Sequence, residues 1–165
     1  MVVPSLSVVG SGILFSMATQ LGYVGHYQGP RTQDLTTPRQ FFDRLNEKHR
    51  FTMDGAATSD NALLPCYSSE AFPRSWQGER VFCNPPWSNI RPFVELAPTA
   101  EFACLLVPAR TNYLWFHRAL ELGARVEFFK SRLRFGSERY NSPVDCLLLI
   151  FDRSVAHSGA CLNTL

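Results

Sequence analysis

The chain has 165 residues, of which 45% are apolar and 18% charged, and its formal net charge is +2. This composition excludes an intrinsically disordered chain, and the length fits one domain with its own core. A charge so close to zero also excludes a histone-like polycation. Contact with a nucleic acid would therefore have to use a local basic surface.

Residues 1–33 form a predicted N-terminal extension of unknown role, 34–153 the main domain and 154–165 a C-terminal tail. No basic segment precedes the apolar residues near the start, so a secretory signal is not expected. The apolar run 12–23 is interrupted by Ser16, Thr19 and Gln20, and we therefore predict no membrane span and no membrane partner.

The first predicted element of the main domain is a helix with Thr37 as its N-cap. Pro38 suits the first helical position, and Gln40 completes a capping box. Further along the chain we predict helices over 90–97 and 112–122, and strands over 50–54, 80–83, 102–107, 125–129 and 144–151.

Strands that alternate with helices predict an α/β domain whose sheet is mostly parallel, with helices on both faces. The last two strands have no helix between them, so we expect them to pair antiparallel through residues 130–143. Ligands of such sheets bind beyond the carboxyl ends of the strands. Asp54 and Asn84 both fall at such ends, which predicts a site there.

The five cysteines, at positions 66, 83, 104, 146 and 161, contain no Cys-x-x-Cys pair, so no metal site is predicted. Cys83, Cys104 and Cys146 lie inside apolar runs. That placement is typical of reduced core cysteines in a cytosolic protein.

The most specific motif is Asn84-Pro85-Pro86-Trp87, directly after a predicted strand. The Asn84 side-chain oxygen and the Pro85 carbonyl can each accept one N–H of an exocyclic amino group. These two bonds would direct the nitrogen lone pair towards a methyl donor. Trp87 offers a flat face on which a base can stack, and a base in duplex DNA would have to be flipped out to reach it.

This motif is similar to the catalytic motif of the amino-methyltransferases, Asp/Asn-Pro-Pro followed by an aromatic residue. From about Thr36 to Phe151 the chain resembles the small phage and prophage DNA adenine methyltransferases, a Dam-type family. Other matching segments are Thr37-Pro38, Phe51 to Ala57, Asn61-Ala62, Leu106 to Thr111, Trp115 to His117 and Arg132 to Gly136. The family commonly has Tyr where this chain has Trp87, and a larger residue where it has Gly55.

The resemblance implies a Rossmann-like methyltransferase domain over 34–153 with no separate target-recognition domain. It also implies S-adenosylmethionine as cofactor, double-stranded DNA as partner and the cytoplasm of a bacterial host as location. Restriction-modification is a further context that it suggests. The expected cofactor-binding residues are Thr37, Pro38, Asp54, Gly55, Ala56 and Glu70. Asp54 would bind the methionine ammonium, and Glu70 the ribose hydroxyls.

DNA contacts are expected from the loops 110–118 and 130–143, through Arg110, His117, Arg132 and Arg134. Trp115 and Phe116 are expected in the core. Two alternatives stay open. The acceptor could be another planar amino group, that of cytosine or of a glutamine side chain, or the protein could be a catalytically inactive DNA-binding module.

Overall fold

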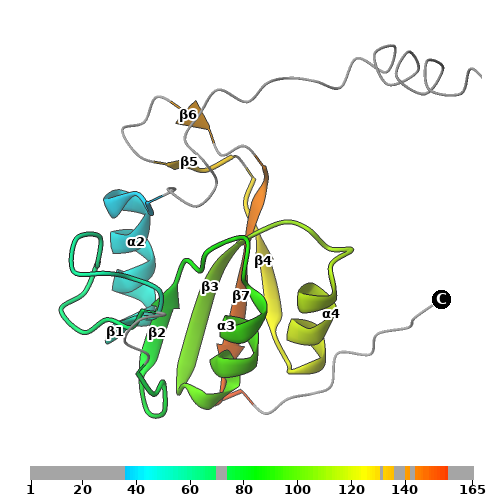
Figure 1. Ribbon diagram of the computed structural model, residues 1–165, viewed down its shortest axis with the longest axis horizontal. Helices are drawn as coiled ribbons and strands as arrows, with labels where there is room; N and C mark the ends of the chain where they lie inside the picture. The colour runs from blue at the N-terminus through cyan, green and yellow to red at the C-terminus, as the bar shows by residue number, and fades with distance from the viewer. Residues whose placement is uncertain (1–35, 70–73, 131, 136–139, 142–143, 156–165) are drawn as a thin grey trace, which may run out of the picture.

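The computed structural model describes residues 36–69, 74–130, 132–135, 140–141 and 144–155 (Figure 1). Its helical segments are α2 (Arg39–His49), α3 (Arg91–Leu96), η1 (Ala97–Thr99) and α4 (Leu114–Glu121). Its strands are β1 (Met53–Asp54), β2 (Arg80–Cys83), β3 (Phe102–Pro108), β4 (Arg125–Phe128), β5 (Arg134–Phe135), β6 (Tyr140–Asn141) and β7 (Cys146–Asp152).

Five strands form one mixed sheet in the order β1-β2-β3-β7-β4. β1, β2 and β3 pair in parallel, and β7 lies antiparallel between β3 and β4. This arrangement confirms the predicted α/β domain, in which the sheet is parallel except for its terminal strand. The antiparallel pairing of the last two strands of the sheet is also confirmed. The short β5–β6 pair, within the connection before β7, was not predicted.

Alternating side chains of the buried strands fill two cores, one on each face of the sheet. Ala103, Leu105 and Val107 of β3 pack in the cluster that α3 and α4 cover. Cys104 and Leu106 pack in the cluster that contains Phe41 and Phe42 of α2. Every residue of β3 is buried, as expected for a strand covered on both faces.

The predicted cysteine burial is confirmed where the structure describes it. Cys83, Cys104 and Cys146 are buried and reduced, and Cys161 lies outside the described residues. None of the helices described is long and apolar enough to cross a membrane.

The capping prediction for the first helix is wrong. Pro38 is the N-cap, with φ −61° and ψ 131°, and no side chain caps this helix. The amides of Phe41 and Phe42 instead donate to the Pro38 carbonyl. Helix α2 therefore begins one residue later than predicted, at Arg39, which leaves the Thr37 hydroxyl available for another contact.

Other predicted bounds shift by a few residues. The strand predicted over 50–54 is reduced to Met53–Asp54, because Arg50 adopts a left-handed conformation at the end of α2. Helix α4 begins at Leu114 instead of 112 and is followed, as predicted, by Gly123 at φ 89°. The amides of Gly123 and Ala124 donate to the Leu120 and Ala119 carbonyls, and these two bonds close the helix.

Candidate active site

The carboxyl ends of the parallel strands lie at one edge of the sheet, which faces upward in Figure 1. Asp54 is the last residue of β1 and pairs with Phe82 of β2. The Gly55 amide extends this ladder by donating to the Phe82 carbonyl at 2.7 Å. Asn84 follows β2 directly, two residues beyond Phe82, or about 7 Å along the strand. Asp54 and Asn84 therefore lie at the carboxyl ends of two neighbouring parallel strands, as predicted.

The side chain of Asn84 is held by a residue from a distant part of the sequence. Its Nδ2 donates to Thr37 Oγ1 at 3.1 Å, and both side chains are half-buried. Because the amide nitrogen faces Thr37, Oδ1 is the atom directed away from that contact. The contact also brings the start of α2 to the motif.

The two prolines form a rigid turn after β2. Pro85 is buried and Pro86 half-buried. The Pro86 carbonyl accepts the Asn89 amide at 2.8 Å, which closes the turn. The Pro85 carbonyl belongs to the same turn and lies directly after the carboxyl end of β2.

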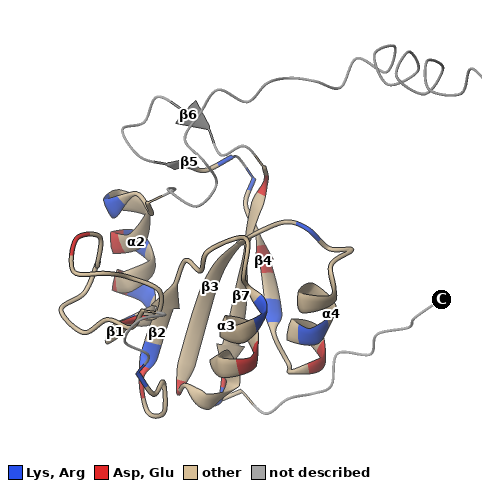
Figure 2. Ribbon diagram, viewed as in Figure 1, with Lys and Arg blue, Asp and Glu red and all other residues tan. Residues whose placement is uncertain are grey.

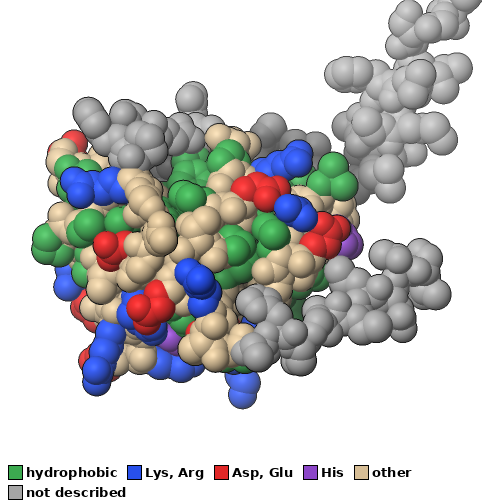
Figure 3. Space-filling model, turned by 90° about the horizontal axis from the view of Figure 1, so that it is seen from below, with side chains coloured by type: hydrophobic (Ala, Val, Ile, Leu, Met, Phe, Trp, Pro, Cys, Tyr) green, Lys and Arg blue, Asp and Glu red, His purple; other side chains and the backbone are tan. Residues whose placement is uncertain are grey.

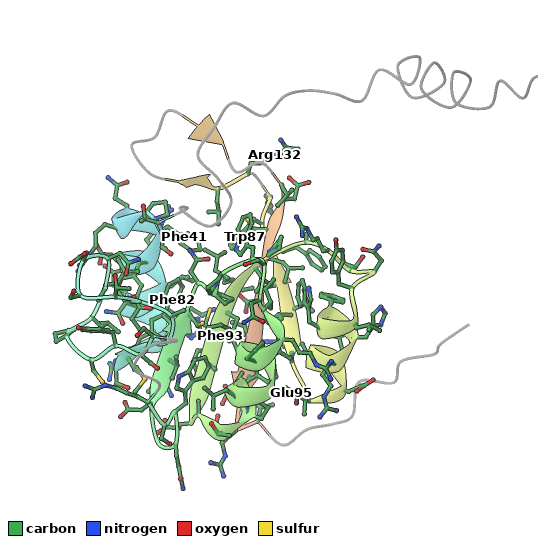
Figure 4. The ribbon with its side chains drawn as sticks, viewed as in Figure 1. Phe41, Phe82, Trp87, Phe93, Glu95 and Arg132 are labelled. Carbon is green, nitrogen blue, oxygen red and sulfur yellow. The ribbon has the colours of Figure 1, made fainter. Side chains whose placement is uncertain are left out.

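Trp87 is buried, with 6% of its surface exposed, in the core cluster that contains Phe41 and Phe82. Figure 4 shows it at the upper end of the sheet. The structure therefore gives Trp87 a packing role. Stacking on a flipped base stays a prediction, and it requires more of the indole to be uncovered than this conformation exposes.

Asp54 is 4% exposed, and backbone amides occupy both of its carboxylate oxygens. Oδ2 accepts the Leu63 amide at 3.1 Å, and Oδ1 accepts the Ala56 amide at 3.4 Å. Burial raises the pKa of this carboxyl group, and the two amide bonds oppose that rise. Asp54 thus organises the loop 55–63, and its predicted contact with a cofactor ammonium remains untested.

The space that a side chain of residue 55 would need is filled by neighbouring core residues. A Cβ atom there would lie 2.5 Å from Trp76 Cζ2 and 2.8 Å from Val81 Cγ1. Trp76 is fully buried, and its Nε1 has no hydrogen-bond partner among the described residues. The sequence-based interpretation of Gly55 as room for a cofactor is therefore matched by a second explanation, the packing of Trp76.

A cavity of about 290 Å³ lies between α2 and the segment that follows β4. Its lining combines apolar side chains with two cations: Phe41, Arg44, Leu45, Phe129, Lys130 and Leu133. Phe41 and Phe129 also meet edge to face, with ring centroids 5.5 Å apart. The chain after β4 therefore crosses to α2 at the edge that carries the motif.

The predicted DNA-contacting residues differ in their surroundings. The Arg110 guanidinium lies over the Tyr113 ring, 5.4 Å from its centroid, and forms no ion pair among the described residues. His117 is exposed one turn into α4. Arg132 lies above the sheet in Figure 4, and its Nε donates to Asp145 Oδ1 at 2.9 Å, so that its charge is paired.

The side chains of two residues that were predicted to bind cofactor or DNA lie outside the described part of the structure. Glu70 lies outside the described residues, and Arg134 is placed in β5 by its backbone alone. Within the described part of the chain, no group of three His, Cys, Asp or Glu side chains gathers as a metal site would need.

Charge is distributed unevenly between the two edges of the sheet (Figure 2). The lower edge, seen from below in Figure 3, mixes basic, acidic and apolar side chains. Much of this charge is paired, as in Arg80–Glu101, Arg118–Glu95 and Arg118–Glu121. The unpaired Arg110 belongs to the carboxyl edge, because it follows the end of β3.

Sequence reasoning missed two features of this edge. The hydrogen bond between Thr37 and Asn84 was not predicted, because Thr37 was interpreted as the N-cap of the first helix. Tyr113 and Leu114 were not singled out, because apolar residues beside Trp115 and Phe116 are expected to be buried. In the structure Trp115 and Phe116 are buried, as predicted, whereas Tyr113 and Leu114 are exposed.

The chain was compared with protein families, curated proteins and solved structures. No curated protein matches the sequence. Among solved structures, one similar chain comes from Pyrococcus horikoshii and is provisionally assigned as an RNA methyltransferase. The likeness has a TM-score of 0.45 at 12% identity and covers 84% of this chain and 96% of that chain. A sequence model of the family described as DNA N-6-adenine-methyltransferase (Dam) matches residues 28–162. The chain therefore belongs to the DNA N-6-adenine-methyltransferase (Dam) family.

Proposed function

We propose that the protein transfers a methyl group from S-adenosylmethionine to the exocyclic amino group of adenine in double-stranded DNA. Membership of the Dam family supports a methyltransferase that acts on this group. The observation that carries the proposal is the placement of Asn84, held by Thr37, at the carboxyl end of β2 and beside the end of β1.

The chemistry follows from the acceptors at this edge. The Asn84 Oδ1 and the Pro85 carbonyl would each accept one amino hydrogen of the flipped base. This orients the nitrogen lone pair out of the plane of the ring. In that orientation the amino nitrogen would be placed to accept a methyl group from the sulfonium of a bound cofactor, whose sulfur would keep the bonding electron pair, and the nitrogen would lose one proton to water. Both acceptors are fixed before the reaction, one by Thr37 and one by the proline turn, so they need not reorganise as charge develops.

The described residues fit the methyl donor in part. Asp54 supplies a carboxylate at the end of β1, and a carboxylate has about four acceptor sites, of which the two backbone amides use two. Thr37 and Pro38 lie at the same edge. When bound, S-adenosylmethionine supplies an electrophilic methyl group on a sulfonium. An ammonium beside Asp54 would also favour its ionised form, against the effect of burial.

The test is methyl incorporation into unmethylated DNA from labelled cofactor, followed by identification of the methylated nucleoside. Asn84→Ala should lower kcat by about 10²–10³-fold and leave cofactor affinity unchanged, because its acceptor acts mainly as charge develops. Asn89→Ala replaces an exposed residue of the same turn and is the matched control. The proposal would be contradicted by a wild-type rate in Asn84→Ala, or by a methylated nucleoside whose base is not adenine.

A second candidate, a catalytically inactive DNA-binding module, is favoured by one observation. The Asp54 carboxylate is buried, and both of its oxygens already accept backbone amides. Titration calorimetry with S-adenosylmethionine separates the two functions. Heat of binding that disappears in Asp54→Asn supports the enzyme, whereas DNA binding with no cofactor binding supports the inactive module.

A further inference from the structure

Large hydrophobic side chains are exposed at four positions of the described chain: Tyr113 (45%), Leu114 (83%), Phe128 (71%) and Val155 (61%). Only Tyr113 and Leu114 are adjacent in sequence. They lie where the loop after β3 enters α4, and β3 is the neighbour of β2, the strand that Asn84 directly follows. An exposed apolar pair is thus presented at the same edge of the sheet as the proposed catalytic motif.

The pair is held in place by its neighbours. The Ala109 amide donates to the Asp145 carbonyl, and the Tyr113 amide donates to the Arg110 carbonyl. Trp115 and Phe116, which follow at once, are buried in the core. The exposure of Leu114 is therefore a fixed feature of this turn.

A positively charged side chain lies beside Tyr113 and Leu114. The Arg110 guanidinium covers one side of the Tyr113 ring and, among the described residues, has no acidic partner. By contrast, Arg118 on the same helix is paired with both Glu95 and Glu121. An apolar tip beside an uncompensated cation suits a surface that alternates flat bases with phosphates, because the cation can meet the phosphate while the tip meets a base.

We propose that Tyr113 and Leu114 form a wedge that enters the base stack of duplex DNA as the target nucleotide leaves it. This inference rests on the proposed function, since a base must leave the stack to reach Asn84. The wedge would fill the gap that the extruded base leaves and would contact its former neighbours. Arg110 orients the tyrosine ring and binds an adjacent phosphate.

The experiment compares methylation of double-stranded plasmid DNA with methylation of the same DNA after heat denaturation. Leu114→Ala and Tyr113→Ala should lose about tenfold or more on the duplex, as expected when one stacking contact is removed. They should keep the wild-type rate on denatured DNA, where no stack has to be opened. Val155→Ala removes an exposed apolar side chain that follows β7 at the opposite edge, and it should match wild type on both forms.

Fluorescence gives a second readout that does not depend on methyl transfer. In duplexes where 2-aminopurine partly replaces adenine, wild-type protein should raise the fluorescence by unstacking the probe. Leu114→Ala should bind without this rise, and Leu114→Met, which keeps a long apolar side chain, should restore it.

Three outcomes would overturn the wedge: equal losses on both DNA forms, unchanged methylation of both, or a normal fluorescence rise in Leu114→Ala. Unchanged methylation would leave the apolar pair as a contact for another protein. Failure of the proposed function would give a different result, because neither the wild-type protein nor the Leu114 variants would then methylate either form of DNA.

Discussion

At the scale of single residues, one hydrogen bond contacts the side chain that is proposed to be catalytic. Asn84 could turn either its nitrogen or its oxygen towards a base, and only the oxygen can accept an amino hydrogen. In the structure Thr37 Oγ1 accepts a hydrogen bond from Asn84 Nδ2 at 3.1 Å, so the side-chain oxygen of Asn84 is directed away from Thr37. Thr37 is on this evidence a positioning residue, whereas the resemblance to the family implies that it binds the cofactor.

Two substitutions at position 37 separate these roles. Thr37→Val keeps the shape but loses the hydroxyl, and a typical hydrogen bond contributes about 1 kcal/mol, so kcat should fall about fivefold. Thr37→Ser keeps the hydroxyl and should stay near wild type. The measurements are single-turnover methylation and cofactor affinity by calorimetry. Weakened cofactor binding with an unchanged rate in Thr37→Val would show that the family-based role is the right one.

Gly55 shows how the packing of the core limits residue choice beside the site. Its Cβ position lies 2.5 Å from the indole of the fully buried Trp76, which has little freedom to move. Gly55→Ala should therefore lower the free energy of unfolding by about 1–3 kcal/mol, the usual cost of overpacking. Chemical denaturation measures this change.

The matched test of this packing explanation uses the partner residue. Trp76→Phe removes the part of the indole that contains Cζ2, so Gly55→Ala should cost less in that background. Gly78→Ala is a control of a different kind, because nothing lies near its Cβ position but its φ of 77° disfavours alanine. An equal cost of Gly55→Ala in both backgrounds would contradict the clash with Trp76.

At the scale of elements, the strands were predicted best where the sequence has continuous apolar runs. Residues 102–107 and 144–151 correspond to β3 and β7, because strands buried on both faces need an unbroken apolar sequence. The ends of elements were less predictable, since they depend on contacts from elsewhere. Thr37 suits a helix cap in isolation, but the chain bonds it to Asn84, a residue 47 positions away.

The positions of the candidate site residues in the fold were predicted to a similar extent, whereas their roles stay predictions. Its location followed from strand ends, because Asp54 and Asn84 end neighbouring parallel strands. The partners of Asp54 could not be predicted, since Leu63 meets it only through the path of the loop. The exposure of Leu114 could not be predicted either, because leucine side chains are usually buried.

The end of α2 provides a prediction about pH. His49 is buried, its ring stacks on Phe102 at 4.7 Å, and its Nε2 lacks a partner among the described residues. Burial, followed by the charge of Lys48, lowers the pKa of this imidazole, and Arg80 and Arg125 act in the same direction while Glu127 opposes them. The unfolded chain then binds more protons than the folded one. Stability should therefore fall as the pH decreases below about 6.5, the ordinary value for histidine.

His49→Phe keeps a ring over Phe102 and removes the titrating group. Its unfolding free energy should depend less on pH than that of wild type between about pH 6.5 and pH 5. Thermal or urea unfolding across this range measures the difference. Parallel pH profiles for the two proteins would show that another group causes the acid sensitivity.

At the scale of the whole molecule, a net charge of +2 requires that DNA attraction come from the arrangement of charges. Acidic partners compensate most described arginines at the lower edge, whereas Arg110, Arg44 and Lys130 at or near the carboxyl edge form no ion pairs within the described chain. Arg132 is intermediate. It lies at the carboxyl edge, but Asp145, just before β7, pairs with it.

The Arg132–Asp145 pair allows a direct test of whether this edge faces DNA. Both side chains are more than half exposed, so the pair contributes about 0–1 kcal/mol and Asp145→Ala should leave stability nearly unchanged. The same substitution removes a negative charge and releases Arg132, so DNA should bind more tightly. If Arg132 then meets a phosphate, the slope of log affinity against log salt should steepen by about 0.9.

Glu121→Ala changes the net charge equally but at the far end of α4, and it should leave DNA affinity and the slope as they are in wild type. Adding Arg132→Ala to Asp145→Ala should remove the gain. Equal DNA affinities and salt slopes for Asp145→Ala and Glu121→Ala would mean that DNA does not approach the carboxyl edge near Arg132.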